Sequence, residues 1–437
     1  MDLATYACRS REELRTEFKK LIARFEELKE EKLDLDMSRG KPSKLQLDLV
    51  SDLLTVLTTA EDCVLEGVDT RNYGDLAGLP CAREYWADVL GCKPEETFVG
   101  GNSSLALQHD LIARAYTHGL KDSPRPWCKE ERIKFLCPSP GYDRHFRITE
   151  SFGFELITVP MTPYGPDMDI VEELVQDPTV KGIWCVPKYS NPQGYSYSDE
   201  TVRRFAELKP AAPDFVIMWD NAYCVHEFDG VFEPFEDIIT LCAEAGRPNM
   251  VYEFGSTSKI TFPGAGMSVM ASSAENIQYM LGLISVQCIS YDKLNQLRHV
   301  RYLKNKEHTL EIMKRHAEIM GPKFEMCLKI LRHEVTNKGI AHWHHPTGGY
   351  FICVAAMPGT AKRTLELCRH AGVRLTEAGS TYPYGVDPHD SMIRIAPSLP
   401  PIEELEKAMY VFCTCLKLAA LEKYLGMTLE QVLGDEF

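Results

Sequence analysis

The sequence has no apolar run long enough to cross a membrane, no internal repeat and no low-complexity tract. Its first twenty residues, MDLATYACRSREELRTEFKK, lack the apolar core of a secretory signal, so we expect a cytoplasmic protein. An excess of positive charge is also missing. The formal net charge is −15, which disfavours nucleic acid or an anionic membrane as the main partner.

The 15 cysteines form no CxxC pair, and only Cys413 and Cys415 lie close together. Such scattered cysteines are typical of small buried side chains in a reducing compartment, and not of disulfides or zinc ligands. The cluster HWHHP, with His342, His344 and His345, has no ligand motif beside it, so we expect a loop before a strand and no metal site. The GGNSS segment lacks the third glycine and the acidic residue of a dinucleotide fingerprint.

The 437 residues are 44% hydrophobic and 25% charged, which are ordinary values for a globular chain. Residues 11–32 have an apolar face and a charged face, which predicts an amphipathic helix. From about residue 49 to 283, apolar strands alternate with helices. This pattern predicts an α/β fold with a mostly parallel sheet that is covered on both faces. Further strands and a final helix predict a second unit after it.

One lysine lies in a segment of unusual composition. In GSTSKITFPGAG, Lys259 follows Ser256 and Ser258 and precedes a glycine-rich stretch. A lysine amine can hold an aldehyde cofactor as a Schiff base, and neighbouring hydroxyls can bind the phosphate of that cofactor. By itself, the motif is at least as typical of a solvated loop.

Two upstream segments support the cofactor interpretation. The apolar run Gly182–Pro187 reads as a buried strand and is followed by Asn191 in an NPQG turn. A second buried strand, Phe215–Trp219, ends at Asp220, with Tyr223 three residues on. Ligands of open parallel sheets bind at the carboxyl ends of the strands. We therefore expect these polar residues to converge with the lysine.

The chemistry of pyridoxal phosphate (PLP) requires these residue types. A buried carboxylate such as Asp220 keeps the pyridine nitrogen protonated, and this lets the ring accept electrons. An amide and a phenol, here Asn191 and Tyr223, can donate to the phenolic oxygen of the ring.

At these positions the chain resembles the fold type I PLP-dependent aminotransferases, with spacings of 29 and 39 residues from asparagine to aspartate to lysine. The resemblance implies a large domain with a mostly parallel seven-stranded sheet and a smaller α+β domain. It implies residues 1–48 as a helix and arm that join the small domain, 49–300 as the large PLP-binding domain and 301–437 as the small domain. It also implies a homodimer with shared active sites.

The resemblance assigns further residues. Tyr73, in RNYGDLAG, would reach the cofactor phosphate of the partner subunit, and Tyr142 would stack on the cofactor ring. Asn102, Ser103 and Ser104 open a helix after a strand, where backbone N–H groups can bind a phosphate, although a serine there is more commonly a helix cap without a ligand. The remaining residues are assigned to the substrate: Arg394 to the α-carboxylate, together with Asn191, Gly40, Arg39 and Lys41.

The sequence departs from the family's usual pattern at two positions, and these departures indicate a subgroup of the family. The family's phosphate-binding arginine, eight residues after the lysine, is replaced by Met267, and Gly40 has basic neighbours on both sides. These features are similar to the divergent class Ic aspartate aminotransferases. They imply a ping-pong transaminase in which Lys259 shuttles the Cα proton, with L-aspartate or L-glutamate as donor and a 2-oxo acid as acceptor.

Three other functions stay open at this point. They are an alanine–glyoxylate type of transaminase, a PLP-dependent lyase or decarboxylase on the same fold, and a PLP-sensing regulator. A distal carboxylate on the substrate would need a second cation, for which Arg39, Lys41 and, from the other subunit, Lys293 or Arg298 are candidates.

Overall fold

The computed structural model describes residues 5–434. Two compact units make up the chain. The larger unit contains residues 45–190 and 195–318, and the smaller unit contains the residues up to 44, residues 191–194 and those from 319 onward.

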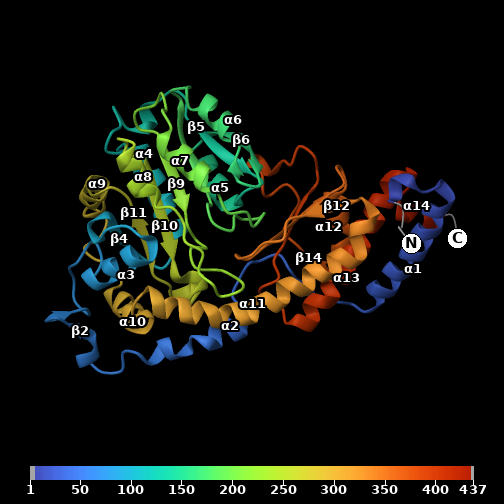
Figure 1. Cartoon of the computed structure of the whole chain (residues 1–437), viewed down its shortest axis with the longest axis horizontal. Helices are drawn as coiled ribbons and strands as arrows, with labels where there is room; N and C mark the ends of the chain where they lie inside the picture. Colours follow the sequence, from blue (N-terminus) through green and yellow to red (C-terminus); the bar gives the residue numbers. More distant parts are fainter. Residues whose placement is uncertain (1–4, 435–437) are drawn as a thin grey trace. The chain divides into compact units, whose positions relative to one another are not determined.

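An eight-stranded sheet forms the centre of the larger unit (Figure 1). Its strands are, in spatial order, β4 (Thr97–Val99), β11 (Ser268–Ala271), β10 (Val251–Ser256), β9 (Val216–Asp220), β8 (Val180–Cys185), β5 (Lys134–Ser139), β6 (Glu155–Thr162) and β7 (Gly165–Pro166). The five strands from β10 to β6 are parallel, whereas β11 runs antiparallel to both neighbours. The predicted α/β fold with a mostly parallel sheet is confirmed, and the two-residue β7 is an addition at its edge.

Both faces of this sheet are covered, which explains the continuous apolar runs of β8 and β9. Alternate residues of β9 enter opposite cores, with Ile217 and Trp219 in one cluster and Val216 and Met218 in the other. The helices of the unit are α3 (Pro80–Leu90), α4 (Ser104–Thr117), α5 (Asp143–Ser151), α6 (Met168–Leu174), α7 (Asp199–Glu207), α8 (Ile238–Glu244), α9 (Ala274–Ile284) and α10 (Lys293–Leu303). A short α2 (Lys44–Leu49) and a hairpin of β2 (Val64–Leu65) and β3 (Val68–Asp69) precede them.

The division between the units falls inside one long helix, α11 (Lys306–Val335). The first part of α11 packs in the larger unit, where Ile312 and Met313 join the core and Thr309 Oγ1 lies 3.0 Å from Tyr85 Oη. Residues 301–318 therefore group with the larger unit, beyond the boundary at residue 300 that we expected from the sequence.

The smaller unit combines an antiparallel sheet with long helices. Its sheets are β12 (Ala341–Trp343), β13 (Ile352–Ala356) and β15 (Met392–Ile395), and the pair of β1 (Leu35–Asp36) and β14 (Val373–Arg374). Its helices besides α11 are α1 (Arg11–Glu30), α12 (Ala361–His370), α13 (Ile402–Leu425) and α14 (Leu429–Gly434). The HWHHP segment was expected in a loop, but His342 lies in β12 and pairs with Ala355 of β13. The prediction missed this strand because it is three residues long and only partly buried.

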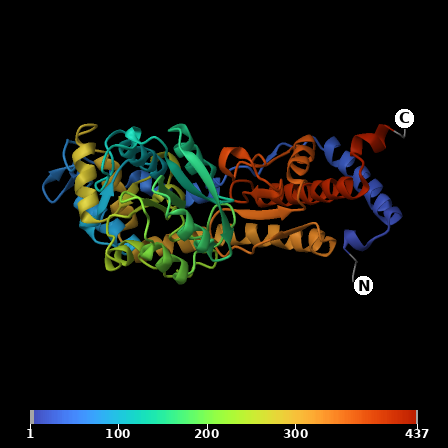
Figure 2. The same ribbon diagram turned by 90° about the horizontal axis from the view of Figure 1, so that it is seen from above.

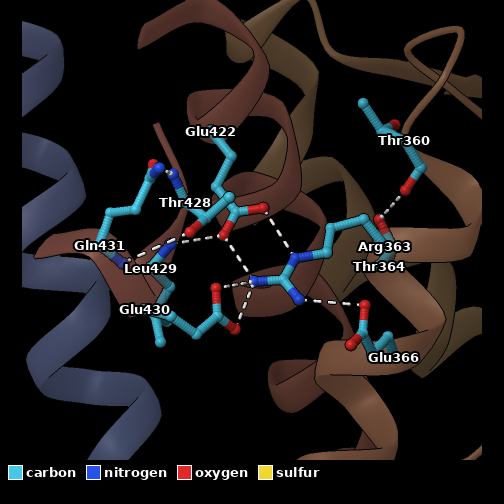
Figure 3. A network of polar contacts seen from close by, with 9 residues as sticks. All are labelled: Thr360, Arg363, Thr364, Glu366, Glu422, Thr428, Leu429, Glu430 and Gln431. Atoms are coloured by element: carbon cyan, nitrogen blue, oxygen red, sulfur yellow. Dashed lines mark hydrogen bonds and ion pairs between the residues drawn. The ribbon is translucent and has the colours of Figure 1, made fainter. Parts of the chain in front are cut away.

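The predicted amphipathic helix is α1, which begins with a capping box between Ser10 and Glu13. Its apolar face is buried, and the helix packs against α13, as Figure 2 shows in blue and red. A network around Arg363 attaches the last helix to this unit (Figure 3). Arg363 donates to the carboxylates of Glu422 in α13 and Glu430 in α14, each at 2.8 Å. One side chain thus joins three helices.

All fifteen cysteines are free thiols, and most of them are buried. Among residues 5–434, no helix is long and apolar enough to span a membrane.

Candidate functional site

Three of the predicted residues come together at the carboxyl ends of two neighbouring strands. Asp220 is the last residue of β9, and Lys259 lies in the short 3-10 helix Thr257–Lys259 that follows β10. The two strands are parallel, with Phe254 opposite Asp220. Tyr223 follows β9, and its ring centroid lies 5.0 Å from Lys259 Nζ. The larger unit therefore brings Asp220, Tyr223 and Lys259 to one edge of its sheet.

Asp220 is buried and has one carboxylate oxygen without a partner. Its Oδ2 lies 2.9 Å from His145 Nε2, whereas Oδ1 has no hydrogen-bond partner among the described residues. A buried carboxylate oxygen in this state is costly unless a donor completes it. The protonated ring nitrogen of PLP is such a donor, so this site fits the cofactor that the sequence predicts.

His145 is a functional candidate that the sequence analysis missed. It lies in α5, and its ring stacks on Trp184 with centroids 4.4 Å apart and an interplanar angle of 10°. The predicted stacking residue Tyr142 is three positions earlier, with its ring 4.8 Å from that of His145. No local motif marks His145, because its partner Asp220 is 75 residues away in the sequence.

Lys259 is partly buried. Burial lowers the pKa of Lys259 below its ordinary value, and the charge of Asp220 acts in the opposite direction. An amine with a lowered pKa is more often neutral near neutral pH, and the neutral form is the nucleophile and the base.

The predicted phosphate ligands lie on two adjacent turns. Ser256 and Ser258 precede the lysine with their Oγ atoms 2.6 Å apart, and Ser258 Oγ lies 3.5 Å from the main-chain oxygen of Asn102. Ser103 caps α4, and Ser104 is the first residue of that helix. The N-terminal N–H groups and the dipole of α4 favour an anion here.

Met267 occupies the position of the family's arginine as part of the protein core. Its side chain is 1% exposed and packs in the larger apolar cluster of the sheet. Its main-chain N–H donates to Thr257 Oγ1 at 2.9 Å. A phosphate at this site would therefore find no cation at residue 267.

Tyr73 is 75% exposed, and a buried lysine supports its segment. Lys293 Nζ donates to the main-chain oxygen of Tyr73 at 3.1 Å and to Asp75 Oδ2 at 3.0 Å. Lys293 is therefore already paired within its own chain. Arg298, the other distal cation candidate, donates from Nη2 to Asn295 at 2.5 Å, and its buried Nε has no partner among the described residues.

In the smaller unit, Arg394 of β15 contacts Asn191, another of the predicted substrate residues. Arg394 donates from Nη1 to Asn191 Oδ1 at 3.2 Å and from Nη2 to Thr376 Oγ1 at 3.0 Å. Its guanidinium carbon lies 4.7 Å from the ring centroid of Phe351. A Cβ atom at Gly40 would lie 2.5 Å from the same ring, so any larger residue there would force the ring to move.

Arg39 and Lys41, on either side of that glycine, are exposed. Among residues 5–434, no group of three or more histidine, cysteine or acidic side chains could hold a metal ion.

Known proteins match almost the whole chain. The family model described as aspartate amino-transferase matches residues 9–428. An aspartate aminotransferase of Corynebacterium glutamicum is 48% identical over 401 residues, which cover 92% of this chain and 93% of that protein.

Two solved structures extend the comparison. The structure of an aspartate transaminase from C. glutamicum is 46% identical and matches with a TM-score of 0.93 over 94% of this chain and 97% of that chain. The α-aminoadipate aminotransferase of Thermus thermophilus, solved with N-(5'-phosphopyridoxyl)-L-leucine, is 20% identical and has a TM-score of 0.72 over 90% of this chain and 93% of that chain. At that identity it shows the fold alone.

Proposed function

Because this chain belongs to the aspartate amino-transferase family, we propose that it is a PLP-dependent transaminase with L-aspartate or L-glutamate as amino donor and a 2-oxo acid as acceptor. The two half-reactions would follow one another in a ping-pong scheme.

One observation carries the cofactor proposal, and it is the incomplete hydrogen bonding of Asp220. The unpartnered Oδ1 of this buried carboxylate would pair with the charged ring nitrogen of PLP. When bound, PLP supplies an electron sink that stabilises negative charge at the substrate Cα. His145 would keep Asp220 oriented through its contact with Oδ2.

Lys259 would hold the cofactor aldehyde and then act as general base and acid. Its amine would take a proton from the substrate Cα and deliver one in the return direction. The lowered pKa of Lys259 suits this role, because a base works best when its pKa is close to the pH of the reaction.

The other predicted residues would bind and orient. Tyr223 and Asn191 would donate to the phenolic oxygen, and Tyr142 would cover the ring. The phosphate would be bound by the amide or hydroxyl groups of Asn102, Ser103, Ser104, Ser256 and Ser258. Arg394 would bind the substrate α-carboxylate with Gly40 and Asn191, and its contacts with Thr376 and Phe351 hold the guanidinium in a fixed plane for a bidentate pair.

The choice of a dicarboxylic substrate rests on the relative from C. glutamicum and on the available cations. Since Lys293 is paired with Asp75, Arg298 is the stronger candidate for a cation from the second subunit. Arg39 and Lys41 are exposed and would act from the same chain.

We also propose a homodimer in the cytoplasm. Large apolar side chains of the larger unit are exposed, among them Tyr73 at 75%, Val286 at 89% and Ile289 at 64%. Exposed apolar groups favour burial by a second copy of the chain. In that dimer, Tyr73 would reach the cofactor phosphate of the other subunit. Fifteen free thiols support a reducing compartment.

A donor comparison tests this function. The purified protein is supplied with PLP and 2-oxoglutarate, and kcat/KM is measured for L-aspartate and L-alanine side by side. We expect a clear preference for aspartate and, without an acceptor, about one equivalent of oxaloacetate per subunit. A preference for alanine would overturn the dicarboxylate proposal, and release of CO2 without amino transfer would indicate a decarboxylase.

A further inference from the structure

Threonines two residues before and two residues after Lys259 hold the turn that carries it. Thr257 is 0% exposed and Thr261 is 1% exposed. The N–H of Thr257 donates to Met267 O at 2.9 Å, and the N–H groups of Ile260 and Thr261 donate to Thr257 O at 2.9 and 2.8 Å. The two buried hydroxyl groups need partners of their own, because a buried hydroxyl without a hydrogen bond is costly.

These hydroxyls belong to one continuous chain of hydrogen bonds. Met267 N–H donates to Thr257 Oγ1 at 2.9 Å, and Thr257 Oγ1 lies 3.0 Å from Thr261 Oγ1. Thr261 Oγ1 lies 2.9 Å from His299 Nε2. At the far end, His299 Nδ1 lies 2.8 Å from the main-chain oxygen of Asn295. The chain therefore runs from the loop after the lysine to helix α10.

The main-chain oxygen of Asn295 sets the position of the proton on the ring of His299. A carbonyl oxygen only accepts, so the ring proton of His299 lies on Nδ1 and faces Asn295. His299 is fully buried, and burial lowers its pKa to about 4, with Arg298 acting in the same direction and Asp292 in the opposite one. The neutral ring presents a lone pair at Nε2. The hydroxyl of Thr261 is therefore the donor, with His299 Nε2 at 2.9 Å, Thr257 Oγ1 at 3.0 Å and the main-chain oxygen of Thr257 at 3.2 Å as its acceptors.

Two further contacts hold the same segment. Asn295 of α10 donates from Nδ2 to the main-chain oxygen of Gly266 at 2.7 Å. His316 of α11, which is also buried, has Nε2 at 3.0 Å from the main-chain oxygen of Ile260. The residues around Lys259 are therefore fixed on both sides.

We propose that Thr257, Thr261 and His299 are positioning residues for Lys259. Their hydrogen bonds hold the backbone of the turn, so that the amine moves only through the torsions of its own side chain. This inference rests on the proposed transaminase function, in which Lys259 transfers the Cα proton. Loss of these hydrogen bonds would leave the turn less firmly held and would slow that proton transfer. Substrate binding would be nearly unchanged, because none of the three residues is assigned to the substrate.

Variants of Thr261 test the hydroxyl. Thr261→Val keeps the shape and removes the hydroxyl, whereas Thr261→Ser keeps the hydroxyl. We expect kcat to fall roughly tenfold or more in the valine variant, with KM for the amino acid within about twofold, since small misplacements of a reacting group are costly. The serine variant should recover most of kcat.

Variants of His299 test the acceptor. Glutamine places an amide oxygen near the position of Nε2, where it can accept from Thr261. Asparagine places its amide near Nδ1 only. His299→Gln should therefore retain a larger share of the wild-type kcat than His299→Asn. If His299 only fills space, the two variants should not differ in kcat in this way.

Thr309→Val is the matched control. It removes another fully buried threonine hydroxyl of the larger unit, which contacts Tyr85 and lies outside this hydrogen-bond chain. We expect a similar loss of stability and an unchanged kcat. The proposal is overturned if Thr261→Val lowers kcat no more than Thr309→Val does, or if KM rises in proportion.

Amide hydrogen exchange gives a readout that does not depend on activity. In the full-length protein, with and without added PLP, Thr261→Val should speed exchange across residues 257–267, and Thr309→Val should not. Unchanged protection of that segment in Thr261→Val would overturn the inference. If the wild-type protein has no transaminase activity, the proposed function fails, and the exchange comparison alone decides whether the chain holds the turn.

Discussion

His145 and Asp220 form a buried pair in which His145 Nε2 lies 2.9 Å from Asp220 Oδ2, while the second carboxylate oxygen has no partner in the described residues. The stacking of His145 on Trp184 fixes the plane of the imidazole, and the imidazole in turn fixes the carboxylate. One oxygen is thereby held by the histidine, and the other is the atom that we propose pairs with PLP.

Replacement of Asp220 by asparagine tests the ligand role of this carboxylate. The amide keeps the volume of the side chain and cannot carry the charge that a protonated ring nitrogen needs. We expect kcat to fall by roughly a hundredfold or more, as for other groups that stabilise developing charge, and PLP to bind more weakly. Steady-state kinetics and a PLP titration measure both effects, with thermal unfolding as a control for folding. Unchanged turnover would contradict the role.

Labelling tests Lys259. Borohydride reduction of the protein with PLP should attach the cofactor to this lysine, and peptide mapping locates the label. Lys188 is the natural comparison because it lies close to the NPQG turn in the sequence. It is only 1% exposed, and its Nζ is 2.5 Å from Glu227 Oε1, so it should not react. A label on Lys188 would contradict the assignment of Lys259.

The sequence alone was sufficient to place Asp220 and Lys259 at the ends of buried strands, because continuous apolar runs mark such strands. It was not sufficient for His145 or His299. Their partners are 75 and 38 residues away in the chain, and only the packing of helices on the sheet brings them together. The unit boundary at residue 318 was also missed, because α11 continues through it as one helix despite Gly321 and Pro322.

A subunit hybrid tests the role of Tyr73. Removal of its hydroxyl in Tyr73→Phe should weaken PLP binding by roughly tenfold or more, since hydrogen bonds to charged groups contribute about 1.5–3 kcal/mol. Lys259→Ala should be inactive. Consider a hybrid dimer with one Tyr73→Phe subunit and one Lys259→Ala subunit. If Tyr73 serves the other subunit, one site of the hybrid contains both substitutions and the other contains neither. Each hybrid should then have one site with wild-type affinity for PLP. Affinity equal to that of Tyr73→Phe alone would show that the tyrosine serves its own chain.

Glu253 lies in β10, beside the strand that ends at Asp220. Asn221 donates from its main chain to Phe254 at 2.9 Å and from Nδ2 to Glu253 Oε1 at 2.8 Å, so the residue after Asp220 is attached to β10 twice. Burial raises the pKa of Glu253 from 4.5 to about 8, while the bond from Asn221 acts in the opposite direction.

The folded protein therefore keeps a proton on Glu253 that the unfolded chain loses above pH 4.5. Between about pH 4.5 and 8 the folded state binds more protons, so Glu253 should make the free energy of unfolding decrease as the pH rises, by up to roughly 1.4 kcal/mol per pH unit. Glu253→Gln keeps an acceptor for Asn221 and removes the titration. We expect it to be more stable than the wild type at pH 8 and to differ little at pH 5 in urea unfolding. Glu84→Gln, at an exposed position, is the control and should give no such difference. If the stability of Glu253→Gln relative to the wild type were the same at both pH values, Glu253 would not titrate in this pH range. The prediction that Glu253 is a buried neutral carboxyl group would then be wrong.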